Sequence, residues 1–263
     1  MNNILDEIIA KRKQTVSQLK QIIPMAGWEM LPNFSKKTLS LKKILEEGNT
    51  TGIIAEFKRA SPSKGIINDK ADVSDVTGDY ELYGAAALSV LTEPLFFKGN
   101  NDDLLNAAIS ANIPILRKDF IFDKYQLTES KALGADVILL IAACLKPREV
   151  QDLAIFAKQL KLEVLLEIHQ EEELEHICDE IDFVGVNNRD LKTFTVDINR
   201  SIELSRKIPA DKIKIAESGI DKPETIRIFK EAGFKGFLMG EKFMKENNPG
   251  EAFKAFVQKL KQQ

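Results

Sequence analysis

Two ionisable residues stand at the end of the first strongly apolar run in the sequence. Glu56 and Lys58 follow the run 52–55, Gly-Ile-Ile-Ala, whose composition and length predict a short buried strand. Residues two apart on a strand point to the same face, and charge is costly at the edge of a core. We therefore expect this carboxylate and this ammonium to take part in chemistry rather than in packing.

Four more strand-like runs end in residues of the same kinds. The residues that close or follow these runs are Lys118, Glu167, Asn187 and Glu217. A single charged residue at a strand end is commonly just solvated, because loops are polar in any case. Solvation alone is a weaker explanation for five strand ends that all carry Lys, Glu or Asn. The pattern indicates that these side chains share one rim of the fold, where the strands end.

Two glycines predict an anion site on the same rim. Gly219 follows the predicted seventh strand, and Gly240 follows the eighth. Barrels of parallel strands commonly bind phosphate at these two places, through backbone N–H groups and a short helix N-terminus. Ser61, in the loop after the first strand, could add a hydroxyl. Either glycine alone is typical of an ordinary turn, but together they favour a phosphorylated substrate.

Strand-like and helix-like segments alternate along the chain. Strands are predicted at Ile53–Phe57, Ala87–Leu91, Ile113–Leu116, Asp136–Ile141, Glu163–Ile168, Phe183–Val186, Lys212–Ala216 and Gly236–Met239. The segments between them have helical periodicity, and eight such units over about 250 residues predict an α/β fold, the (β/α)8 or TIM barrel. An open doubly wound sheet is the alternative. It is disfavoured because no Gly-x-Gly-x-x-Gly follows the first strand.

The first 50 residues precede the predicted barrel and also show helical spacing of apolar residues. We expect them to form a helical N-terminal extension that packs on the barrel. No linker or low-complexity tract interrupts the chain, so we expect one domain over residues 1–263. In such a barrel, catalysis takes place at the C-terminal ends of the strands.

Composition and charge exclude several classes of protein. The 263 residues carry a formal net charge of −3, which gives no field for binding a nucleic acid. A hydrophobic share of 44% and a charged share of 29% are those of a globular protein, and no apolar run reaches the length of a membrane span. The mixed charges near the N-terminus are not those of a signal peptide. We expect neither a nucleic-acid nor a membrane partner.

The cysteines and histidines indicate neither a disulfide nor a metal site. Cys144 and Cys178 lie in apolar or helical surroundings without a Cys-x-x-Cys motif, so we expect free thiols in a reducing compartment, the cytoplasm. His169 and His176 have no Cys or Asp nearby that completes a ligand set, so we expect no metal and take both histidines for surface residues. The run Glu171–Glu173 is expected to form a solvated first helical turn.

The motifs described above resemble those of one enzyme family. The segment 54–65, Ile-Ala-Glu-Phe-Lys-Arg-Ala-Ser-Pro-Ser-Lys-Gly, is similar to the signature of indole-3-glycerol-phosphate synthases, which close the indole ring in tryptophan biosynthesis. The resemblance covers nearly the whole chain. It continues through Leu116–Phe120, Leu166-Glu167, Gly185–Leu191, Ala216–Ile220 and Met239–Glu241.

The resemblance implies a reaction and a set of catalytic residues. The family converts 1-(2-carboxyphenylamino)-1-deoxyribulose 5-phosphate to indole-3-glycerol phosphate, with loss of carbon dioxide and water and without a cofactor. It implies that Lys118 is the general acid at the ribulose carbonyl, and that Glu167 and Lys58 supply the base and acid for dehydration. Glu56 is expected to orient one of the two lysines. Asn187 and Glu217 are expected to bind substrate hydroxyls or hold the lysines.

The resemblance also implies how the substrate is bound. Ser61, Gly219, Gly240 and the backbone of Glu241 would receive the phosphate, and Ser218 is expected among the substrate-binding residues. Phe120 and Leu191 would form part of an apolar wall for the aromatic ring, and Arg189 would lie near its carboxylate. Some relatives place a small hydroxyl residue at position 241, so only the backbone N–H of Glu241 is expected to contact phosphate. The loop from Arg59 to Asp72 could close over that group.

The same residues disfavour two other functions. A class I aldolase needs a lysine with a depressed pKa and a free amine, whereas carboxylates gathered around Lys58 and Lys118 would raise the pKa. A phosphosugar-binding barrel without activity would lack an acid or a base, yet Lys58, Lys118 and Glu167 are all present. The expected partner is a small phosphosugar substrate, and other enzymes of tryptophan biosynthesis are candidate partners.

Overall fold

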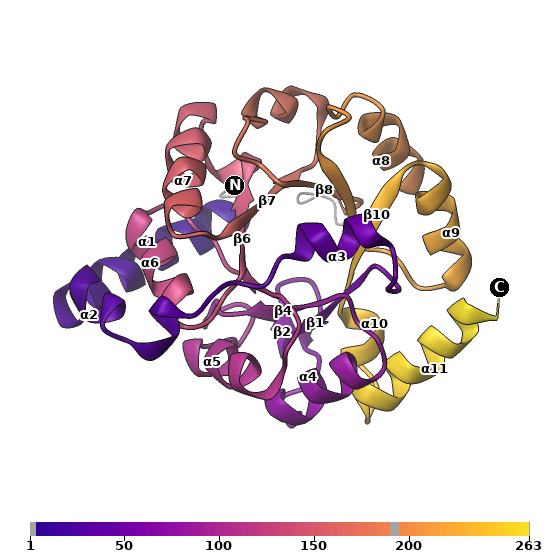
Figure 1. Cartoon of the computed structure of the whole chain (residues 1–263), viewed down its shortest axis with the longest axis horizontal. Helices are drawn as coiled ribbons and strands as arrows, with labels where there is room; N and C mark the ends of the chain where they lie inside the picture. The colour runs from indigo at the N-terminus through magenta and orange to yellow at the C-terminus, as the bar shows by residue number, and fades with distance from the viewer. Residues whose placement is uncertain (1–3, 190–194, 263) are drawn as a thin grey trace.

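Eight parallel strands close into a barrel in the computed structural model, which describes residues 4–189 and 195–262 (Figure 1). The barrel strands are β1 (Ile53–Phe57), β4 (Ala87–Leu91), β5 (Ile115–Lys118), β6 (Val137–Ile141), β7 (Glu163–Ile168), β8 (Phe183–Asn187), β9 (Ile213–Glu217) and β10 (Phe234–Met239). Each strand pairs with its neighbours in chain order, and β10 closes the ring by pairing with β1. The closed ring confirms the predicted TIM barrel and excludes the open doubly wound sheet.

The strands are apolar on both faces because both faces are covered. All five residues of β6 are buried, as are all five of β1 and of β4. One face of each strand fills the barrel interior, and the other packs under the surrounding helices, as in parallel sheets generally. The polar residues that these strands do carry, such as Glu56 and Glu217, therefore stand out as buried charges.

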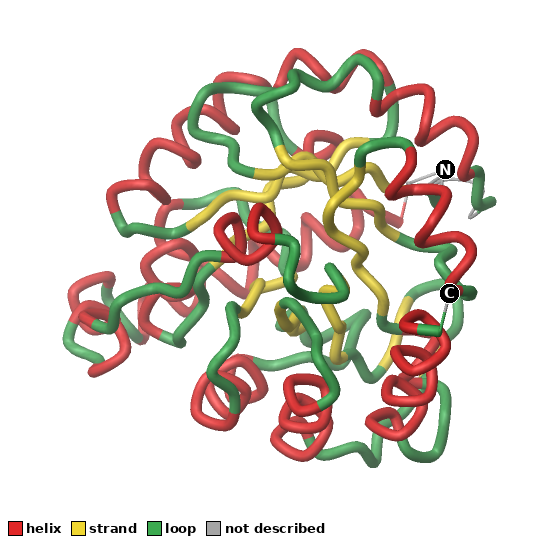
Figure 2. Tube along the Cα trace, turned by 45° about the vertical axis from the view of Figure 1, so that its right-hand side comes forward, coloured by secondary structure: helices red, strands yellow, loops and turns green. Residues whose placement is uncertain are grey.

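Helices surround the strands on the outside of the barrel (Figure 2). They are α4 (Val73–Leu82), α5 (Asn101–Ser110), α6 (Lys124–Ala132), α7 (Pro147–Gln159), α8 (Ile198–Ser205), α9 (Pro223–Glu231), α10 (Glu241–Met244) and α11 (Pro249–Lys261), with short 3-10 helices η2 (Ala142–Cys144) and η3 (Glu171–His176). Side chains cap several of them at the start: Asp72 accepts from the backbone of Ser74 and Asp75, and Asn100 accepts from that of Asp103.

The N-terminal segment contributes helices to both ends of the barrel. It comprises α1 (Ile4–Ile22), α2 (Met25–Glu29), η1 (Pro32–Ser35) and α3 (Leu41–Glu47). In Figure 1, α3 crosses the middle of the barrel, and its Leu41 and Leu45 are buried with Ile54 of β1. Glu163, the first residue of β7, accepts from the backbone N–H of Leu41. Hence α3 covers the end of the barrel where the strands begin.

The predicted strands agree with the structure to within two residues at each end. The bounds of β1, β4 and β7 are those predicted, whereas β5 begins two residues later than predicted, at Ile115. The sequence did not reveal the small antiparallel hairpin of β2 (Ala60–Ser61) and β3 (Gly65–Ile66) within the first loop. In the part of the chain that the structure describes, no helix is both long and apolar enough to cross a membrane.

Candidate active site

A pocket of roughly 310 Å³ opens at the end of the barrel where the strands finish. It brings together the described residues that the sequence analysis singled out, from the ends of six strands and the loops after them. They are Glu56, Lys58, Ser61, Lys118, Phe120, Glu167, Asn187, Arg189, Glu217, Ser218, Gly219, Gly240 and Glu241. Leu191, the remaining predicted residue, lies outside the described residues.

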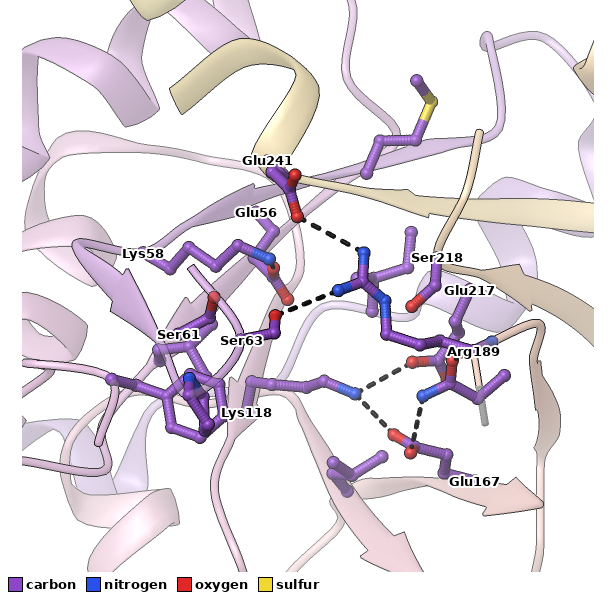
Figure 3. Close-up of a pocket in the computed structure, with 18 of the residues that line it drawn as sticks. Glu56, Lys58, Ser61, Ser63, Lys118, Glu167, Arg189, Glu217, Ser218 and Glu241 are labelled. Carbon is purple, nitrogen blue, oxygen red and sulfur yellow. Dashed lines mark hydrogen bonds and ion pairs between the residues drawn. The ribbon is translucent and has the colours of Figure 1, made fainter. Parts of the chain in front are cut away.

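The centre of the pocket is an ammonium held between two carboxylates. Lys118 Nζ lies 2.7 Å from Glu167 Oε2 and 2.8 Å from Glu217 Oε2, and the three side chains point toward one another (Figure 3). They come from β5, β7 and β9. Alternate strands of a closed barrel send side chains into the same layer, which explains how residues so far apart in the chain converge.

A glycine on the strand between two of these makes room for Glu217. A Cβ atom at Gly185 of β8 would lie 2.2 Å from Glu217 Oε1 and 3.1 Å from a methyl carbon of Leu165. No side chain fits there, so the glycine leaves the space that the Glu217 carboxylate occupies beside Lys118.

The two carboxylates have opposite electrostatic character. Burial would lower the pKa of Lys118, but Glu167 and Glu217 outweigh it and hold that pKa above its usual range. Burial would likewise raise the pKa of Glu167, but Lys118 and His169 outweigh it and keep this carboxylate ionised. For Glu217 burial prevails over Lys118 and raises the pKa to about 7. Paired acids whose pKa values are pushed apart are typical of acid–base catalysis.

A second ion pair lies beside the first. Lys58 Nζ is 2.7 Å from Glu56 Oε1, and the Lys58 side chain is only 16% exposed. Of the two lysines that Glu56 was expected to orient, the structure thus pairs it with Lys58. Gly240 allows this arrangement, since a Cβ atom there would lie 2.7 Å from both Cβ and Oε1 of Glu56.

The features expected of an anion site lie on one side of the pocket. Ser218 and Gly219 are consecutive residues in the left-handed conformation, with φ of 67° and 69°. A Cβ atom at Gly219 would lie 2.3 Å from Val196 Cγ1, so only glycine fits. The hydroxyl of Ser61 is buried and has no hydrogen-bond partner among the described residues. A buried hydroxyl of this kind fits a bound oxyanion, because an unsatisfied polar group is otherwise costly.

Arg189 spans the mouth of the pocket. Its Nη1 donates to Ser63 Oγ at 3.1 Å, and its Nη2 lies 3.4 Å from Glu241 Oε2 (Figure 3). The guanidinium thus joins the first loop to the start of α10. Asn187 Oδ1 accepts from the backbone N–H of Arg189 at 3.0 Å, which fixes the backbone of the arginine just after the end of β8. No role was predicted for Ser63, although it lies inside the segment 54–65.

The N-terminal helix forms part of the pocket wall, which the sequence analysis did not foresee. Ile4, Leu5 and Ile8 of α1 line the pocket together with Phe120 and Leu139. Nothing in the local sequence marks these residues, because the apolar face of a helix is the same whether it covers a core or a binding site. The side of the pocket that they form is apolar and suits an aromatic ring.

The expectation that both histidines lie on the surface was wrong. His169 and His176 are each only 8% exposed. The imidazole of His176 contacts the backbone carbonyls of Glu173 and Leu145, at 3.1 and 2.9 Å. His169 lies beside Glu167, with 3.2 Å between its Nε2 and Oε1 of the glutamate. Burial would lower the pKa of His169, but its contacts with Glu167 and Glu173 outweigh that effect and raise the pKa to about 9.

The acidic run after β7 was also only partly solvated. Glu171 and Glu172 are exposed, but Glu173 is buried, and its Oε2 accepts from the backbone N–H of His169 at 2.5 Å. Glu173 lies three residues after Gln170, and its side chain accepts from the backbone N–H of Gln170 at the start of η3. This capping contact keeps the Glu173 side chain against the turn and away from solvent. Both cysteines are free, as expected.

Three comparisons place the chain among known proteins. The family model described as "Indole-3-glycerol phosphate synthase" matches residues 5–256. A protein of that name from Bacteroides thetaiotaomicron is 45% identical over 260 residues, covering 99% of this chain and 100% of the relative. One from Bordetella pertussis is 38% identical over 254 residues, covering 95% of this chain and 97% of the relative.

Solved structures share the fold at much lower identity. A chain of the tryptophan synthase complex from Pyrococcus furiosus superposes with a TM-score of 0.61 at 15% identity, covering 81% of this chain and 99% of the other. Tryptophan synthase subunit alpha from Legionella pneumophila also superposes with a TM-score of 0.61 at 15% identity, and the match covers 84% of this chain and 97% of the other chain. At such identities the likeness concerns the barrel fold alone.

Proposed function

The chain belongs to the indole-3-glycerol phosphate synthase family, and from this premise we propose that it closes the indole ring in tryptophan biosynthesis. The substrate is 1-(2-carboxyphenylamino)-1-deoxyribulose 5-phosphate, and the products are indole-3-glycerol phosphate, carbon dioxide and water. The observation that carries the proposal is the Lys118 ammonium, on a side chain only 14% exposed, between Glu167 and Glu217 in a pocket with a polar and an apolar side.

Ring closure needs a proton at the ribulose carbonyl oxygen. Lys118 donates it while the anilino ring carbon attacks the carbonyl carbon, so the oxygen becomes a hydroxyl as the new carbon–carbon bond forms. A raised pKa keeps Lys118 protonated at neutral pH, as a general acid requires. Loss of carbon dioxide then restores the aromatic ring. Glu217 lies 2.8 Å from Lys118, and its pKa of about 7 suits it to return a proton to the lysine.

Dehydration needs an acid for the leaving hydroxyl and a base for a proton of the ring system. Glu167 is ionised and serves as the base. Lys58 is the acid that protonates the hydroxyl, and Glu56 at 2.7 Å holds its ammonium in place. Asn187 Nδ2 donates to Glu167 Oε1 at 3.0 Å and so helps to fix the direction of the base. In this scheme each ammonium group acts once.

The phosphate and the aromatic ring occupy opposite sides of the pocket. Ser61, Gly219, Gly240 and the backbone N–H of Glu241 receive the phosphate, with Ser218 beside them. Phe120 and the α1 residues cover the ring, and Arg189 lies near its carboxylate. Leu191 is proposed for the same apolar wall. The loop 59–72 contains Ser63, which already contacts Arg189, so this loop is suited to close over the bound substrate.

The direct test is the appearance of indole fluorescence when the purified protein meets the carboxyphenylamino-ribulose phosphate, with no metal or cofactor added. Lys118→Ala should abolish turnover while leaving the fold intact by circular dichroism. Lys20→Ala, which removes an exposed lysine paired with Asp123, is the matched control and should keep full activity. Product formation by Lys118→Ala at a rate near that of the unaltered protein would refute the assignment of the acid.

An aldolase remains the alternative enzyme. It would form a Schiff base between Lys58 or Lys118 and a carbonyl substrate, which requires a neutral amine. The raised pKa of Lys118 opposes this. Borohydride should therefore trap no covalent adduct on either lysine.

We further propose that residues 1–263 act as one domain, because α1 of the N-terminal extension contributes to the wall of the barrel's own pocket. We also propose that the protein acts in the cytoplasm, since free thiols such as those of Cys144 and Cys178 are typical of a reducing compartment. Other enzymes of tryptophan biosynthesis are proposed as partners on the strength of the family alone.

A further inference from the structure

One buried ionisable group beside the site has no role in the scheme above. His169 is the second residue after Glu167 and lies at the point where β7 ends. Its ring stands between two carboxylates: Nε2 is 3.2 Å from Glu167 Oε1, and Nδ1 is 3.7 Å from Glu173 Oε2. Neither ring nitrogen forms a hydrogen bond of good geometry within residues 4–189 and 195–262. At these distances the ring is placed to form ion pairs with both carboxylates.

The charges around His169 favour its protonated form. A buried neutral imidazole with unsatisfied nitrogens would be costly, whereas an imidazolium is compensated by the carboxylates on both sides. The remaining ionisable groups nearby are Cys144 of η2, whose thiol pKa burial raises to about 12, and His176 of η3, whose ring already contacts two backbone carbonyls. From α1, Asp6 and Lys13 face Cys144 and bring opposite charges. Lys13 is the cation among these groups, and its ammonium lies over the ring of Phe122 rather than beside Glu167 or Glu173.

The contacts of Glu167 divide between its two oxygens. Oε2 accepts from Lys118, and Oε1 accepts from Asn187 and faces His169. His169 thus touches the side of the base that Lys118 does not. A carboxylate held at both oxygens cannot rotate, and small misplacements of a catalytic group are costly to the rate.

We propose that His169, as an imidazolium, is a positioning residue for Glu167, held in turn by Glu173 and acting through the ion pair with Glu167 Oε1. The inference rests on the proposed function, in which Glu167 is the base. His169 touches no substrate atom in this scheme. It keeps the carboxylate ionised and turned so that Oε2 faces the Lys118 ammonium. The charge of the imidazole, more than its size, is what the site uses.

The first experiment measures the charge of His169 without any substrate. The chain contains two histidines, so a 15N-histidine-labelled sample gives two imidazoles, which His176→Gln assigns. We expect the His169 signal to titrate with a pKa near 9. A midpoint at or below the ordinary value of about 6.5 would overturn the proposal, because the ring would then be neutral at working pH.

The second experiment follows kcat/KM against pH for the unaltered protein and for His169→Gln. The folded pKa is raised, so the charge is present below about pH 9 and is lost as the pH rises through it. We expect a loss of about tenfold below pH 8, shrinking toward no difference near pH 10, because there both proteins lack the charge. A purely structural role would give a ratio that does not vary with pH, and that result sinks the proposal.

Two further variants separate the explanations. Glu173→Gln keeps the imidazole but removes one of its carboxylates, so the same decline in activity should appear at a lower pH; this variant also serves if His169→Gln does not fold. His176→Gln is the matched control for loss of a buried histidine, and its activity ratio should be constant with pH. If the unaltered protein shows no turnover, the proposed function fails, while the imidazole titration still decides the charge of His169.

Discussion

Arg12 and Asp119, 107 positions apart, form a buried two-point ion pair. Arg12 Nε donates to Asp119 Oδ1 at 2.9 Å, and Nη2 donates to Oδ2 at 2.6 Å. The side chains are 4% and 0% exposed. Asp119 directly follows Lys118, the proposed general acid. The pair therefore fastens α1 of the N-terminal extension to the strand that carries the acid, and it does so at the end of the barrel where the pocket opens.

Other buried groups complete the surroundings of Asp119. Thr92 Oγ1 donates to Oδ2 at 2.6 Å, and Arg117 Nη2 lies 3.0 Å from the same oxygen. Arg117 is itself paired with Glu129, at 2.7 Å. Burial would raise the pKa of Asp119, but Arg12 and Arg117 outweigh it and lower that pKa below its usual range. A carboxylate held in this way stays charged.

We expect Arg12→Ala to destabilise the protein strongly. Removing one partner of a buried ion pair costs up to about 3–5 kcal/mol, and here Arg117 still compensates part of the Asp119 charge. The free energy of unfolding in urea measures this. Lys20 lies on the same helix as Arg12, and Lys20→Ala removes its partly exposed ion pair with Asp123. This change should cost no more than about 1 kcal/mol. Equal losses of unfolding free energy in the two variants would contradict the claim that the buried ion pair stabilises the fold more than the exposed one.

Stability should depend on pH through Glu217. Its pKa is raised to about 7 in the folded chain, so the folded state holds the proton more tightly than the unfolded state. This contribution to stability is complete at acid pH and is lost as the pH rises toward about 7. Glu217→Gln removes the ionisation. The free energy of unfolding of this variant, minus that of the unaltered protein, should increase by roughly 2–3 kcal/mol as the pH rises from about 5 to 8. Urea unfolding at a series of pH values measures this difference.

Glu167→Gln is the control, because the pKa of Glu167 is shifted in the opposite direction to that of Glu217. The pKa of Glu167 is lowered in the folded chain, so its contribution is lost only as the pH falls into the acid range. Removing Glu167 also takes away a like charge that raises the pKa of Glu217, so relative to the unaltered protein this variant should gain less stability from about pH 5 to pH 8 than Glu217→Gln does. A slope shared by both variants would show that Glu217 is not the group responsible.

Gly185→Ala should disable the site without replacing a catalytic residue. The new methyl would lie 2.2 Å from Glu217 Oε1 and push that carboxylate away from Lys118. A displacement of about 1 Å in an active site costs on the order of 100-fold in kcat/KM, which steady-state kinetics would detect. Gly78→Ala, on α4 with no atom within 4 Å of the new methyl, is the control and should retain activity. Near-normal turnover by Gly185→Ala would argue against a fixed Glu217.

Ser61→Ala should weaken substrate binding more than it slows chemistry. The Ser61 hydroxyl is buried without a partner in the described parts of the chain, and the proposal gives it a phosphate oxygen. Loss of a hydrogen bond to a charged group costs about 1.5–3 kcal/mol, so KM should rise at least about tenfold with little change in kcat. Ser110→Ala, whose exposed hydroxyl bonds its own helix at Asn106, should leave both constants unchanged. A fall in kcat at constant KM would place Ser61 elsewhere in the reaction.

The sequence determined the order of strands and helices and the kind of residue that ends each strand. Apolar runs and helical periodicity are properties of neighbouring residues, so β1, β4 and β7 were predicted with their observed bounds. Glu56, Lys58 and Lys118 were found for the same reason: a charged residue directly after a buried run is visible without knowing where the run lies in space.

Closure of the barrel decided everything that depends on distant residues. Only the ring shows that Lys118 lies between Glu167 and Glu217, since their strands alternate with others around the barrel. Arg12 gave no sign of its partner, and His169 was taken for a surface residue because solvent exposure depends on what packs against a turn. Local pattern specifies backbone and residue type, whereas burial, and with it every pKa shift in this site, arises from contacts that the chain makes only when folded.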